Sequence, residues 1–280
     1  MLPPFPIQAA KSLITLAVTE DIGTGDITST ALVKKGSYGK AFFCSRQAIR
    51  LAGMPILSLL WEQYEASVTV HPYVADGIDV LAGTILCQVE GDACTLLALE
   101  RSALNFIQYL SGIATRTAVF VSAIAGTGTQ ILDTRKTIPG FRAMAKYAVV
   151  CGGGKNHRFG LYDGVLIKDN HLAIVGGVKP ALQQIRAAGH KDFILECDTL
   201  EQVEQALEDG APWLLLDNMS LDELAAVVRL AKGKAVLEAS GGITLENARI
   251  IADIGVDYLS IGGLTHSAPA VDIGLDWDMQ

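Results

Sequence analysis

The sequence contains few aromatic residues, no paired cysteine motif and no long apolar run. Its five cysteines form no CxxC pair and show no metal-site spacing, which fits buried thiols in a reducing compartment. No segment approaches the roughly 18 consecutive apolar residues that a membrane helix requires. The first residues, MLPPFPIQ, lack the basic region and apolar run of a signal peptide. These absences predict a cytoplasmic protein with no membrane partner.

Positive charge is also scarce. The 22 Lys and Arg residues face 30 Asp and Glu residues, and the resulting net charge of −8 excludes a general nucleic-acid binder. The cations are gathered, however, because residues 134–171 hold seven of the 22 basic residues and only two of the 30 acidic ones. An acidic protein that concentrates its cations in this way is predicted to bind a multiply charged anion.

The first third of the chain is predicted to form a small α+β unit. Half of the 280 residues are hydrophobic, enough to fill a sizeable core in one large domain or two smaller ones. Apolar residues at helical spacing predict a helix over 7–20, and 54–64 is also expected to be helical. The glycines and aspartates of 21–29 indicate a loop. Three β-rich segments predict an antiparallel sheet: 38–47, 66–74 and 84–92.

Residues 96–125 have the period of a long helix, with a predicted break at Ser111–Gly112. This stretch is expected to bridge the first unit and the rest of the chain. Arg101 lies near its start, and from spacing alone we interpret it as a solvated helix charge.

After residue 125, six short apolar runs alternate with helical segments, which indicates a parallel sheet covered by helices. Six such units favour a closed or nearly closed α/β barrel, and no GxGxxG motif suggests a dinucleotide fold. Asp222 and Thr244 lie near helix starts and are predicted caps. The predicted strands are 131–136, 164–170, 193–198, 213–218, 235–242 and 258–263, and the helices are 178–189, 200–210, 221–233 and 245–255.

Every predicted strand ends in polar or glycine residues, and in α/β barrels the carboxyl ends of the strands carry the active site. Arg favours bidentate contacts with carboxylate or phosphate, whereas Lys supplies a point charge. Carboxylates in so cationic a site are suited to Mg²⁺ or sugar hydroxyls, and glycines expose backbone N–H groups to phosphate. The groups concerned are Arg135, Lys136, Arg158, Lys168, Glu196, Asp217, Ser240, Gly241, Gly242, Gly262 and Gly263. Together they predict a site for a phosphorylated sugar, a metal-bound diphosphate and a further anion.

Each group also has a plainer interpretation when it is taken alone. Lys136 or Lys168 by itself is more often an ion-pair residue than a catalyst, and glycines after strands are often only turns. His157 and His266 are equally consistent with packed imidazoles. The coincidence of such residues at matching strand ends is what favours a site.

The sequence resembles the quinolinate phosphoribosyltransferase family, the carboxylating nicotinate-nucleotide pyrophosphorylases of NAD biosynthesis. The likeness runs through most of the chain and is weaker in the first 90 residues, where DIGTGDIT also fits. Its most specific block is ILDTRKTIPGFRAMAKYAVVCGGGKNHRFGLYDGVLIKDNH (131–171). The other matching blocks are ERSALNFIQYLSGIATRT (100–117), ECDTLEQ (196–202), LLLDNM (214–219), EASGGI (238–243) and SIGGLTHSAPAVDIGLD (260–276).

The resemblance implies an α/β fold of two domains. An N-terminal α+β sandwich domain, 1–110 joined by 268–280, is expected to accompany an incomplete α/β barrel, 111–267. A homodimer or a dimer-based higher oligomer is also implied. Arg101 would then cross the interface to complete the partner's site, which replaces the plainer interpretation given above.

The resemblance further implies a role for each site residue. Arg135, Arg158 and Lys168 would bind quinolinate, and Lys136, His157 and Lys168 would bind the diphosphate of phosphoribosyl pyrophosphate. Glu196 and Asp217 would hold Mg²⁺ and the ribose hydroxyls. The 5-phosphate would be bound by Ser240, Gly241, Gly242, Gly262, Gly263 and His266. Arg101, Thr134 and Ile261 complete the predicted substrate-binding set, and the predicted catalytic residues are Lys136, Lys168, Glu196 and Asp217. Gly263 stands where the family often has Ala, and Cys197 where Val is common; neither position carries a charged role.

The implied reaction is phosphoribosyl transfer to quinolinate with loss of carbon dioxide, which gives nicotinate mononucleotide and diphosphate. Three alternatives stay open at this point: a molybdenum-transport-associated paralogue of the family, a barrel lyase that uses Lys168 as a Schiff base, and a phosphometabolite sensor without activity. The intact GGGKNHR and KDNH patterns argue against the first. The complete set of site cations, with Glu196 and Asp217, argues against the last.

Overall fold

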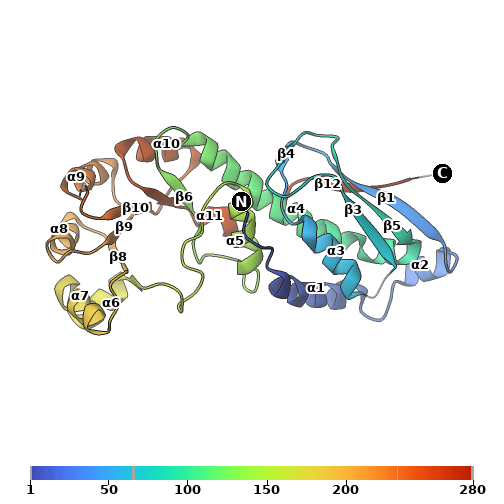
Figure 1. Cartoon of the computed structure of the whole chain (residues 1–280), viewed down its shortest axis with the longest axis horizontal. Helices are drawn as coiled ribbons and strands as arrows, with labels where there is room; N and C mark the ends of the chain where they lie inside the picture. The colour runs from blue at the N-terminus through green and yellow to red at the C-terminus, as the bar shows by residue number, and fades with distance from the viewer. Residues whose placement is uncertain (1, 65–66, 232, 279–280) are drawn as a thin grey trace. The chain divides into compact units, whose positions relative to one another are not determined.

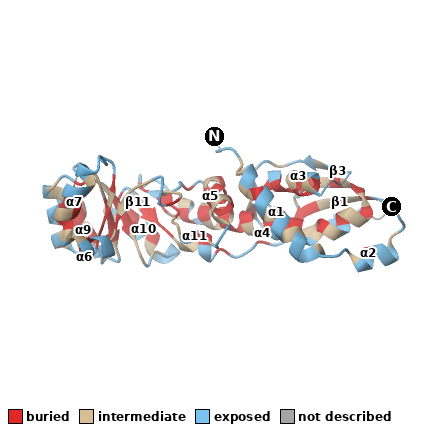
Figure 2. Cartoon of the chain, turned by 90° about the horizontal axis from the view of Figure 1, so that it is seen from below, coloured by how far each residue is buried: buried red, intermediate tan, exposed pale blue. Residues whose placement is uncertain are grey.

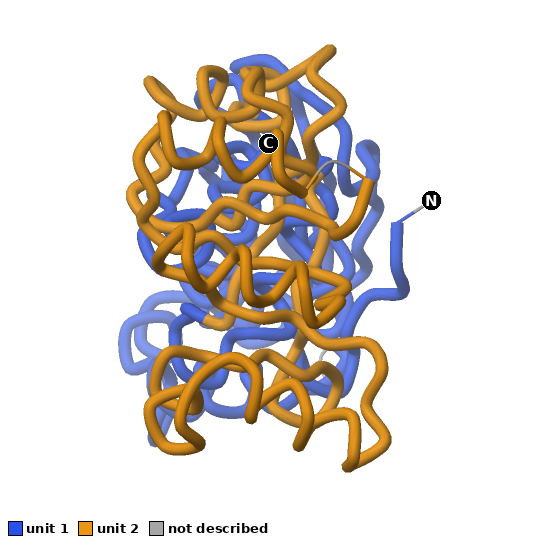
Figure 3. Tube along the Cα trace, turned by 90° about the vertical axis from the view of Figure 1, so that its left-hand side faces the viewer, with its two compact units in different colours: residues 1–118, 136–153, 263–280 blue, residues 119–135, 154–262 orange. Residues whose placement is uncertain are grey.

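The computed structural model describes residues 2–64, 67–231 and 233–278. Packing divides the chain into two compact units, drawn in blue and orange in Figure 3. Unit 1 comprises residues 1–118, 136–153 and 263–280, and unit 2 comprises residues 119–135 and 154–262. Units defined by packing need not coincide with domains, so the predicted boundaries of 1–110 and 111–267 stay a prediction. Within the described ranges, no helix is both long and apolar enough to cross a membrane.

Unit 1 is built on a four-stranded antiparallel sheet in the order β12–β1–β5–β3 (Figure 1). These strands are β1 (Tyr38–Ser45), β3 (Val68–Pro72), β5 (Ile85–Asp92) and β12 (Ile273–Trp277). The first three confirm the predicted strands, although residue 66 of one prediction lies outside the described residues. Two short strands that were not predicted, β2 (Ile49–Arg50) and β4 (Asp79–Val80), pair separately.

Unit 1 also contains the helices α1 (Ile7–Ile22), α2 (Ile27–Leu32), α3 (Met54–Gln63), α5 (Arg142–Cys151) and α11 (Gly263–His266). Helix α3 packs on the sheet at β3. Helix α1 packs on α3, and Trp61 of α3 meets Phe43 of β1 edge-on, with ring centroids 6.3 Å apart. The predicted loop over 21–29 is too long at both ends, because α1 runs on to Ile22. Helix α2 begins inside it because the Asp26 side chain accepts hydrogen bonds from the backbone N–H groups of Thr28 and Ser29.

Helix α4 (Ala93–Ala123) runs through the position where a break was predicted. The Ser111 hydroxyl, although inside the helix, donates to the carbonyl of Ala52 and accepts from its N–H, at 3.2 and 3.1 Å. Gly112 lets another segment approach, because a Cβ there would lie 2.0 Å from the carbonyl oxygen of Pro269. The predicted break is therefore wrong: both residues serve contacts within unit 1 and leave the helix intact.

Unit 2 is an incomplete α/β barrel, as predicted. Its six parallel strands lie in the order β6–β11–β10–β9–β8–β7, and no pairing joins β6 to β7 among the described residues. The strands are β6 (Gln130–Leu132), β7 (Leu166–Ile167), β8 (Ile194–Cys197), β9 (Trp213–Asp217), β10 (Val236–Ser240) and β11 (Tyr258–Ser260). The helices are α6 (Asp169–Val175), α7 (Val178–Ala187), α8 (Leu200–Glu208), α9 (Leu221–Ala231) and α10 (Leu245–Ile254).

Helix starts in unit 2 follow local hydrogen bonding. Thr244 is the N-cap of α10, as predicted. The prediction for Asp222 is wrong, because Ser220 caps α9: its hydroxyl accepts from the N–H of Glu223, whose carboxylate accepts in return from the N–H of Ser220. Asp222 lies inside the first turn, where a negative charge still favours the helix N-terminus.

Buried residues line the strands and the inner faces of the helices (Figure 2). The barrel strands carry near-continuous apolar runs, as expected of a parallel sheet covered by helices. The exceptions are four buried polar residues in or just after these strands: Asp133, Glu196, Glu238 and Ser260. Buried carboxylates need partners, so these residues mark the region in which chemistry has been placed inside the barrel.

Candidate active site

The carboxyl ends of the barrel strands are aligned by their pairing register. Asp217 at the end of β9 lies opposite Ser240 at the end of β10, and Ser240 lies opposite Ser260 at the end of β11. Lys168 directly follows β7, and Glu196 lies in β8. The predicted groups of unit 2 therefore come together at one rim of the barrel.

Lys168 and Glu196 form an ion pair at this rim. The Lys168 Nζ lies 2.5 Å from the Glu196 Oε2, with side chains that are 42% and 9% exposed. The buried carboxylate requires a cation or hydrogen-bond donors, and Lys168 supplies both. An ammonium that donates to a carboxylate has no lone pair for attack on a carbonyl. The lysine is exposed enough to contact a ligand as well.

Carboxylates gather beside this pair. Partial burial, and then the charges of Asp217 and Asp169, raise the pKa of Asp198 above its ordinary value, while Lys168 opposes the shift. Asp198 was absent from the predicted site set. Its position two residues after Glu196, on the same strand end, was the available signal.

Mg²⁺ commonly binds through one or two carboxylates, with waters and substrate phosphate oxygens completing its octahedron. In the part of the chain that the structure describes, no group of three or more His, Cys, Asp and Glu side chains is arranged to hold a metal by itself. Burial is the main cause of the raised pKa of Asp198, and the repulsion by Asp217 and Asp169 that adds to it is the kind that a divalent cation relieves. Among the described residues, the donor set therefore lacks the ligands that a resident structural ion needs.

Two arginines form the cationic part of the rim. The Arg158 Nη1 donates to the carbonyl of Gly164 at 3.1 Å. Burial lowers the pKa of Arg158, and the positive charge of Arg135 lowers it further. Two guanidinium groups close enough to repel one another favour an anion between or beside them.

The last four residues of the GGGKNHR segment, 155–158, lie in unit 2 beside the edge strand β6. Lys155 bridges Leu132 in parallel pairing, and the buried carboxylate of Asp133 accepts from the His157 N–H at 2.9 Å and from the Asn156 amide at 2.6 Å. Asp133 thus fixes the segment that carries Arg158. The sequence analysis did not include Asp133 in the site, although an aspartate that ends an apolar run was a usable signal.

The ends of β9 and β10 are tied together by a tight contact. Asn218 adopts a left-handed backbone with φ +56°, and its N–H donates to the carbonyl of Ser240 at 2.9 Å. Gly241 has φ +88°, and a Cβ there would lie 2.1 Å from the Asn218 Oδ1. Glycine is therefore required at position 241 by backbone geometry alone, so the plainer interpretation as a turn holds alongside the predicted phosphate contact.

Four predicted site residues belong to unit 1 and are described within it. Arg101 is exposed on α4. The carbonyl of Lys136 accepts a hydrogen bond of 2.7 Å from the Thr265 hydroxyl. His266 is exposed at the end of α11, and Gly263 opens that helix.

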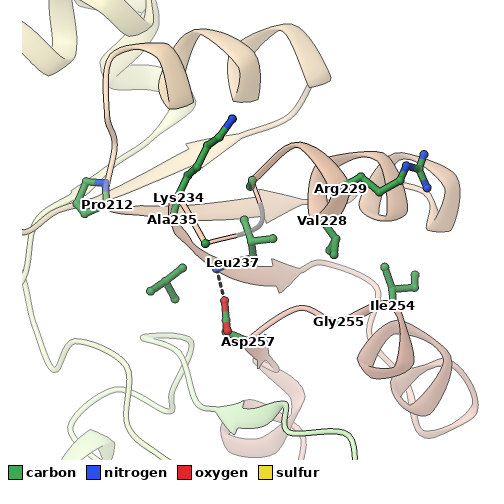
Figure 4. A pocket seen from close by; sticks show the side chains of 12 residues that line it. Pro212, Val228, Arg229, Lys234, Ala235, Leu237, Ile254, Gly255 and Asp257 are labelled. Atoms are coloured by element: carbon green, nitrogen blue, oxygen red, sulfur yellow. Dashed lines mark hydrogen bonds between the residues drawn. The ribbon is translucent and has the colours of Figure 1, made fainter.

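A hollow of about 750 Å³ lies at the amino-terminal ends of the barrel strands (Figure 4). The carboxylate of Asp257 lies in it and accepts from the N–H of Leu237 at 2.8 Å. Arg229 and Lys234 also line it, but none of the predicted site residues does. Its size therefore does not make it the candidate site, because the predicted site residues of unit 2 lie at the other ends of the strands.

A parallel α/β barrel that gathers arginines, a lysine and carboxylates at the carboxyl ends of its strands is the architecture of a barrel enzyme for an anionic substrate. The family model described as quinolinate phosphoribosyl transferase, C-terminal domain, matches residues 113–276, and that of the N-terminal domain matches residues 26–111. The chain belongs to the quinolinate phosphoribosyltransferase family.

Relatives and solved structures agree with this assignment over the full chain. The sequence is 42% identical to a nicotinate-nucleotide pyrophosphorylase (carboxylating) of Mycobacterium leprae, covering 99% of this chain and 100% of that protein. It is 41% identical to a probable enzyme of the same name from Bacillus subtilis, covering 95% and 92%. The crystal structure of nicotinate-nucleotide pyrophosphorylase from Ehrlichia chaffeensis superposes with a TM-score of 0.92 at 40% identity, covering 95% of this chain and 98% of that one.

Proposed function

We propose that the protein transfers the phosphoribosyl group of phosphoribosyl pyrophosphate to quinolinate, with decarboxylation to nicotinate mononucleotide in the de novo synthesis of NAD. The observation that carries the proposal is the family's site pattern on the strand ends of one barrel, where Lys168 pairs with Glu196. Arg135 and Asp217 also follow or end strands, and Arg158 lies near enough to Arg135 for their charges to interact. The fit of both family models supports it across the chain.

In the proposed reaction, the ring nitrogen of quinolinate attacks the anomeric carbon of the sugar while the bond from that carbon to the diphosphate oxygen breaks. Diphosphate leaves with the bonding electrons. The positive charge on the pyridinium ring then stabilises a carbanion at the adjacent carbon, so the carboxylate there departs as carbon dioxide and a proton takes its place.

The side chains act mainly through position and electrostatics. Cations stabilise the leaving diphosphate and bind the two carboxylates of quinolinate. Glu196 and Asp217 lie on neighbouring strands and suit a sugar that gains oxocarbenium character. Lys168, which already holds Glu196 at 2.5 Å, connects the cationic and the acidic halves of the site.

Mg²⁺ is part of this proposal. Asp217 and Glu196, directly or through water, would hold it together with the diphosphate oxygens, and the metal would neutralise charge on the leaving group. Asp198 is a third carboxylate in reach of the same region, because its pKa responds to Asp217. Removal of Mg²⁺ with EDTA is expected to abolish turnover.

We further propose a cytoplasmic homodimer, or an assembly of such dimers, in which Arg101 completes the partner's site. The exposure of Arg101 on α4 supports this. Residues 100–117 also belong to the blocks that match the family.

One assay tests the function. The purified protein is mixed with quinolinate, phosphoribosyl pyrophosphate and Mg²⁺, and carbon dioxide and nicotinate mononucleotide are measured. Equal amounts of both products are expected, and none when any one component is omitted. A protein that binds both substrates without releasing either product would be a sensor, and the proposal would fail.

The Schiff-base alternative is tested separately. Because the Lys168 Nζ is engaged as an ammonium by Glu196, borohydride is not expected to trap a carbonyl substrate on the protein. A trapped adduct that disappears in Lys168→Arg would favour the lyase instead.

A further inference from the structure

A buried carboxylate in unit 2 takes no part in the proposed reaction. Glu238 lies in the middle of β10 and is 0% exposed. Its Oε1 accepts a hydrogen bond from the hydroxyl of Ser260 on the neighbouring strand β11 and lies 3.5 Å from the His157 Nε2. None of the described residues donates to its Oε2. Carboxylates are almost never fully buried unless they are paired, so its burial here points to a role at the site.

The protonation of His157 follows from its neighbours. The N–H of Arg158 donates to the His157 Nδ1 at 2.7 Å, and because a backbone amide can only donate, this nitrogen must be unprotonated. The ring proton is therefore on Nε2, the nitrogen that faces Glu238. The side chain is 7% exposed, so the imidazole is an internal link and not a surface group.

The same ring connects Glu238 to the backbone of Arg158. On the other side, the carboxylate of Asp133 holds the N–H of His157 at 2.9 Å. The short segment before Arg158 is thus fixed by two buried acids, one at its backbone and one at its imidazole. From this fixed point the Arg158 side chain extends to the carbonyl of Gly164 and to the neighbourhood of Arg135.

We propose that Glu238 is a positioning residue: through its 3.5 Å polar contact with the Nε2 of His157 it orients the ring, and with it the backbone from which Arg158 binds the pyridine dicarboxylate. The inference rests on the proposed function because it concerns the same site. It gives His157 an orienting role in place of the diphosphate contact that the family resemblance implies. The contact needs an acceptor that faces the Nε2–H at position 238 and no full charge, so a glutamine, whose carbonyl oxygen can accept from Ser260 and face the His157 Nε2 in the same way, replaces it.

The test compares Glu238→Gln with Glu238→Ala in the full-length enzyme. The KM for quinolinate and the KM for phosphoribosyl pyrophosphate are measured separately. For Glu238→Ala we expect the quinolinate KM to rise about tenfold or more, since a displaced anchor weakens a well-oriented site, with the other KM little changed. Glu238→Gln should restore both constants to near the wild-type values.

A matched control is Thr129→Val at the opposite end of the barrel. The Thr129 hydroxyl is also buried and donates to the carbonyl of Val256 at 2.7 Å, so its loss destabilises unit 2 without touching His157. This variant should leave both KM values unchanged. A glutamine variant as impaired as the alanine variant would overturn the proposal, and so would an alanine variant that raises only the KM for phosphoribosyl pyrophosphate.

A second measurement needs no turnover and no folded alanine variant. ¹⁵N NMR of histidine-labelled wild type and Glu238→Gln should report His157 with Nδ1 unprotonated and Nε2 protonated. A proton on Nδ1 would overturn the positioning role even in an active enzyme. If the protein fails to turn over quinolinate, the expected tautomer would still be seen, so the two failures are distinguishable.

Discussion

Arg135 and Arg158 carry like charges within one rim, near enough for Arg135 to help lower the pKa of Arg158. Both lie on the most cationic stretch of the sequence, residues 134–171. Such an arrangement costs free energy until an anion offsets it. The charges of Asp163 and Glu196 offset part of this cost at Arg158, and an anionic ligand would offset more of it.

We expect Arg135→Ala to weaken catalysis with quinolinate by about 2–4 kcal/mol, the scale for truncating one member of a buried charge pair. The measurement is kcat/KM for quinolinate at saturating phosphoribosyl pyrophosphate. The control is Arg249→Ala, which removes an exposed arginine paired with Asp253 on α10 and should leave kcat/KM unchanged. Equal efficiencies in the two variants would defeat the assignment of Arg135.

A pH effect on stability is expected at Asp76 in unit 1. Its carboxylate accepts from the N–H of Met54 and from the Tyr147 hydroxyl, yet burial outweighs these donors and raises its pKa above the ordinary 3.8. The folded state therefore binds this proton more tightly than the unfolded state. The resulting stability is fully present below pH 3.8 and is lost as the pH rises through the raised pKa.

Asp76→Asn keeps an acceptor and removes the titration. The free energy of unfolding is measured in urea between pH 4 and 7. The value for Asp76→Asn minus the value for the wild type should increase as the pH rises. Asp79→Asn gives the opposite sign, and only below the ordinary 3.8, because Arg50 lowers the pKa of Asp79 and that contribution to stability is lost as the pH falls through the lowered pKa. Parallel pH profiles for the wild type and Asp76→Asn would show that burial does not govern this carboxyl.

The sequence predicts single residues well when their charge and position at a strand end agree. Lys168 and Glu196 were predicted at the rim, and they meet there at 2.5 Å. It does not predict buried acids such as Asp133 and Glu238, whose partners come from segments more than twenty residues away. A contact of that kind depends on strand order and register, which local pattern does not contain.

At the scale of elements, Ser111 and Gly112 show how composition misleads. The pair is typical of a helix break. In α4, however, the Ser111 hydroxyl accepts a hydrogen bond from the N–H of Ala52, and the absence of a side chain at Gly112 leaves room for the backbone of Pro269. Helix α2 shows the converse, because a loop-like sequence contains the cap that starts it at Asp26. Strong periodicity, as in α8, was predicted correctly because burial on one face of a helix is encoded locally. The barrel strands were located by their apolar runs, but β6 and β7 are shorter than the predicted 131–136 and 164–170.

Gly112→Ala tests the close approach. An alanine is intrinsically the better helix former by about 1 kcal/mol, but its Cβ would meet the backbone oxygen of Pro269 at 2.0 Å. Backbone atoms yield less than a flexible side chain, so we expect a net loss of stability of about 1–3 kcal/mol. Urea unfolding followed by circular dichroism measures it.

The control is Ser122→Ala on the exposed side of the same helix, which should change the stability by less than about 0.5 kcal/mol. If Gly112→Ala were as stable as this control, the segment around Pro269 would be free to move away. The interpretation of Gly112 as a contact residue would then be wrong.

For the whole molecule, the sequence predicts a two-part α/β protein with an incomplete barrel, and the structure confirms the fold. The sequence does not predict the assembly in the same way, because hydrophobic patterning reports which residues are buried within one chain and not which residues contact a second chain. Arg101 is an exposed helix charge by spacing and by structure. Only an experiment on two chains can distinguish a solvated arginine from one that enters a partner's site.

Hybrid dimers provide that experiment. In a mixed dimer of Arg101→Ala and Arg135→Ala subunits, one site carries both changes and the other carries neither, if Arg101 acts across a two-fold interface. Each variant alone should be nearly inactive. After random exchange of equal amounts of the two variants, about a quarter of all sites should be intact. As a control, Arg135→Ala mixed with Arg158→Ala should restore nothing, because both arginines lie in unit 2 of one chain and every mixed site retains a defect. Mixtures of the first kind that stay inactive, while native mass spectrometry shows subunit exchange, would place Arg101 in its own subunit's site or outside any site.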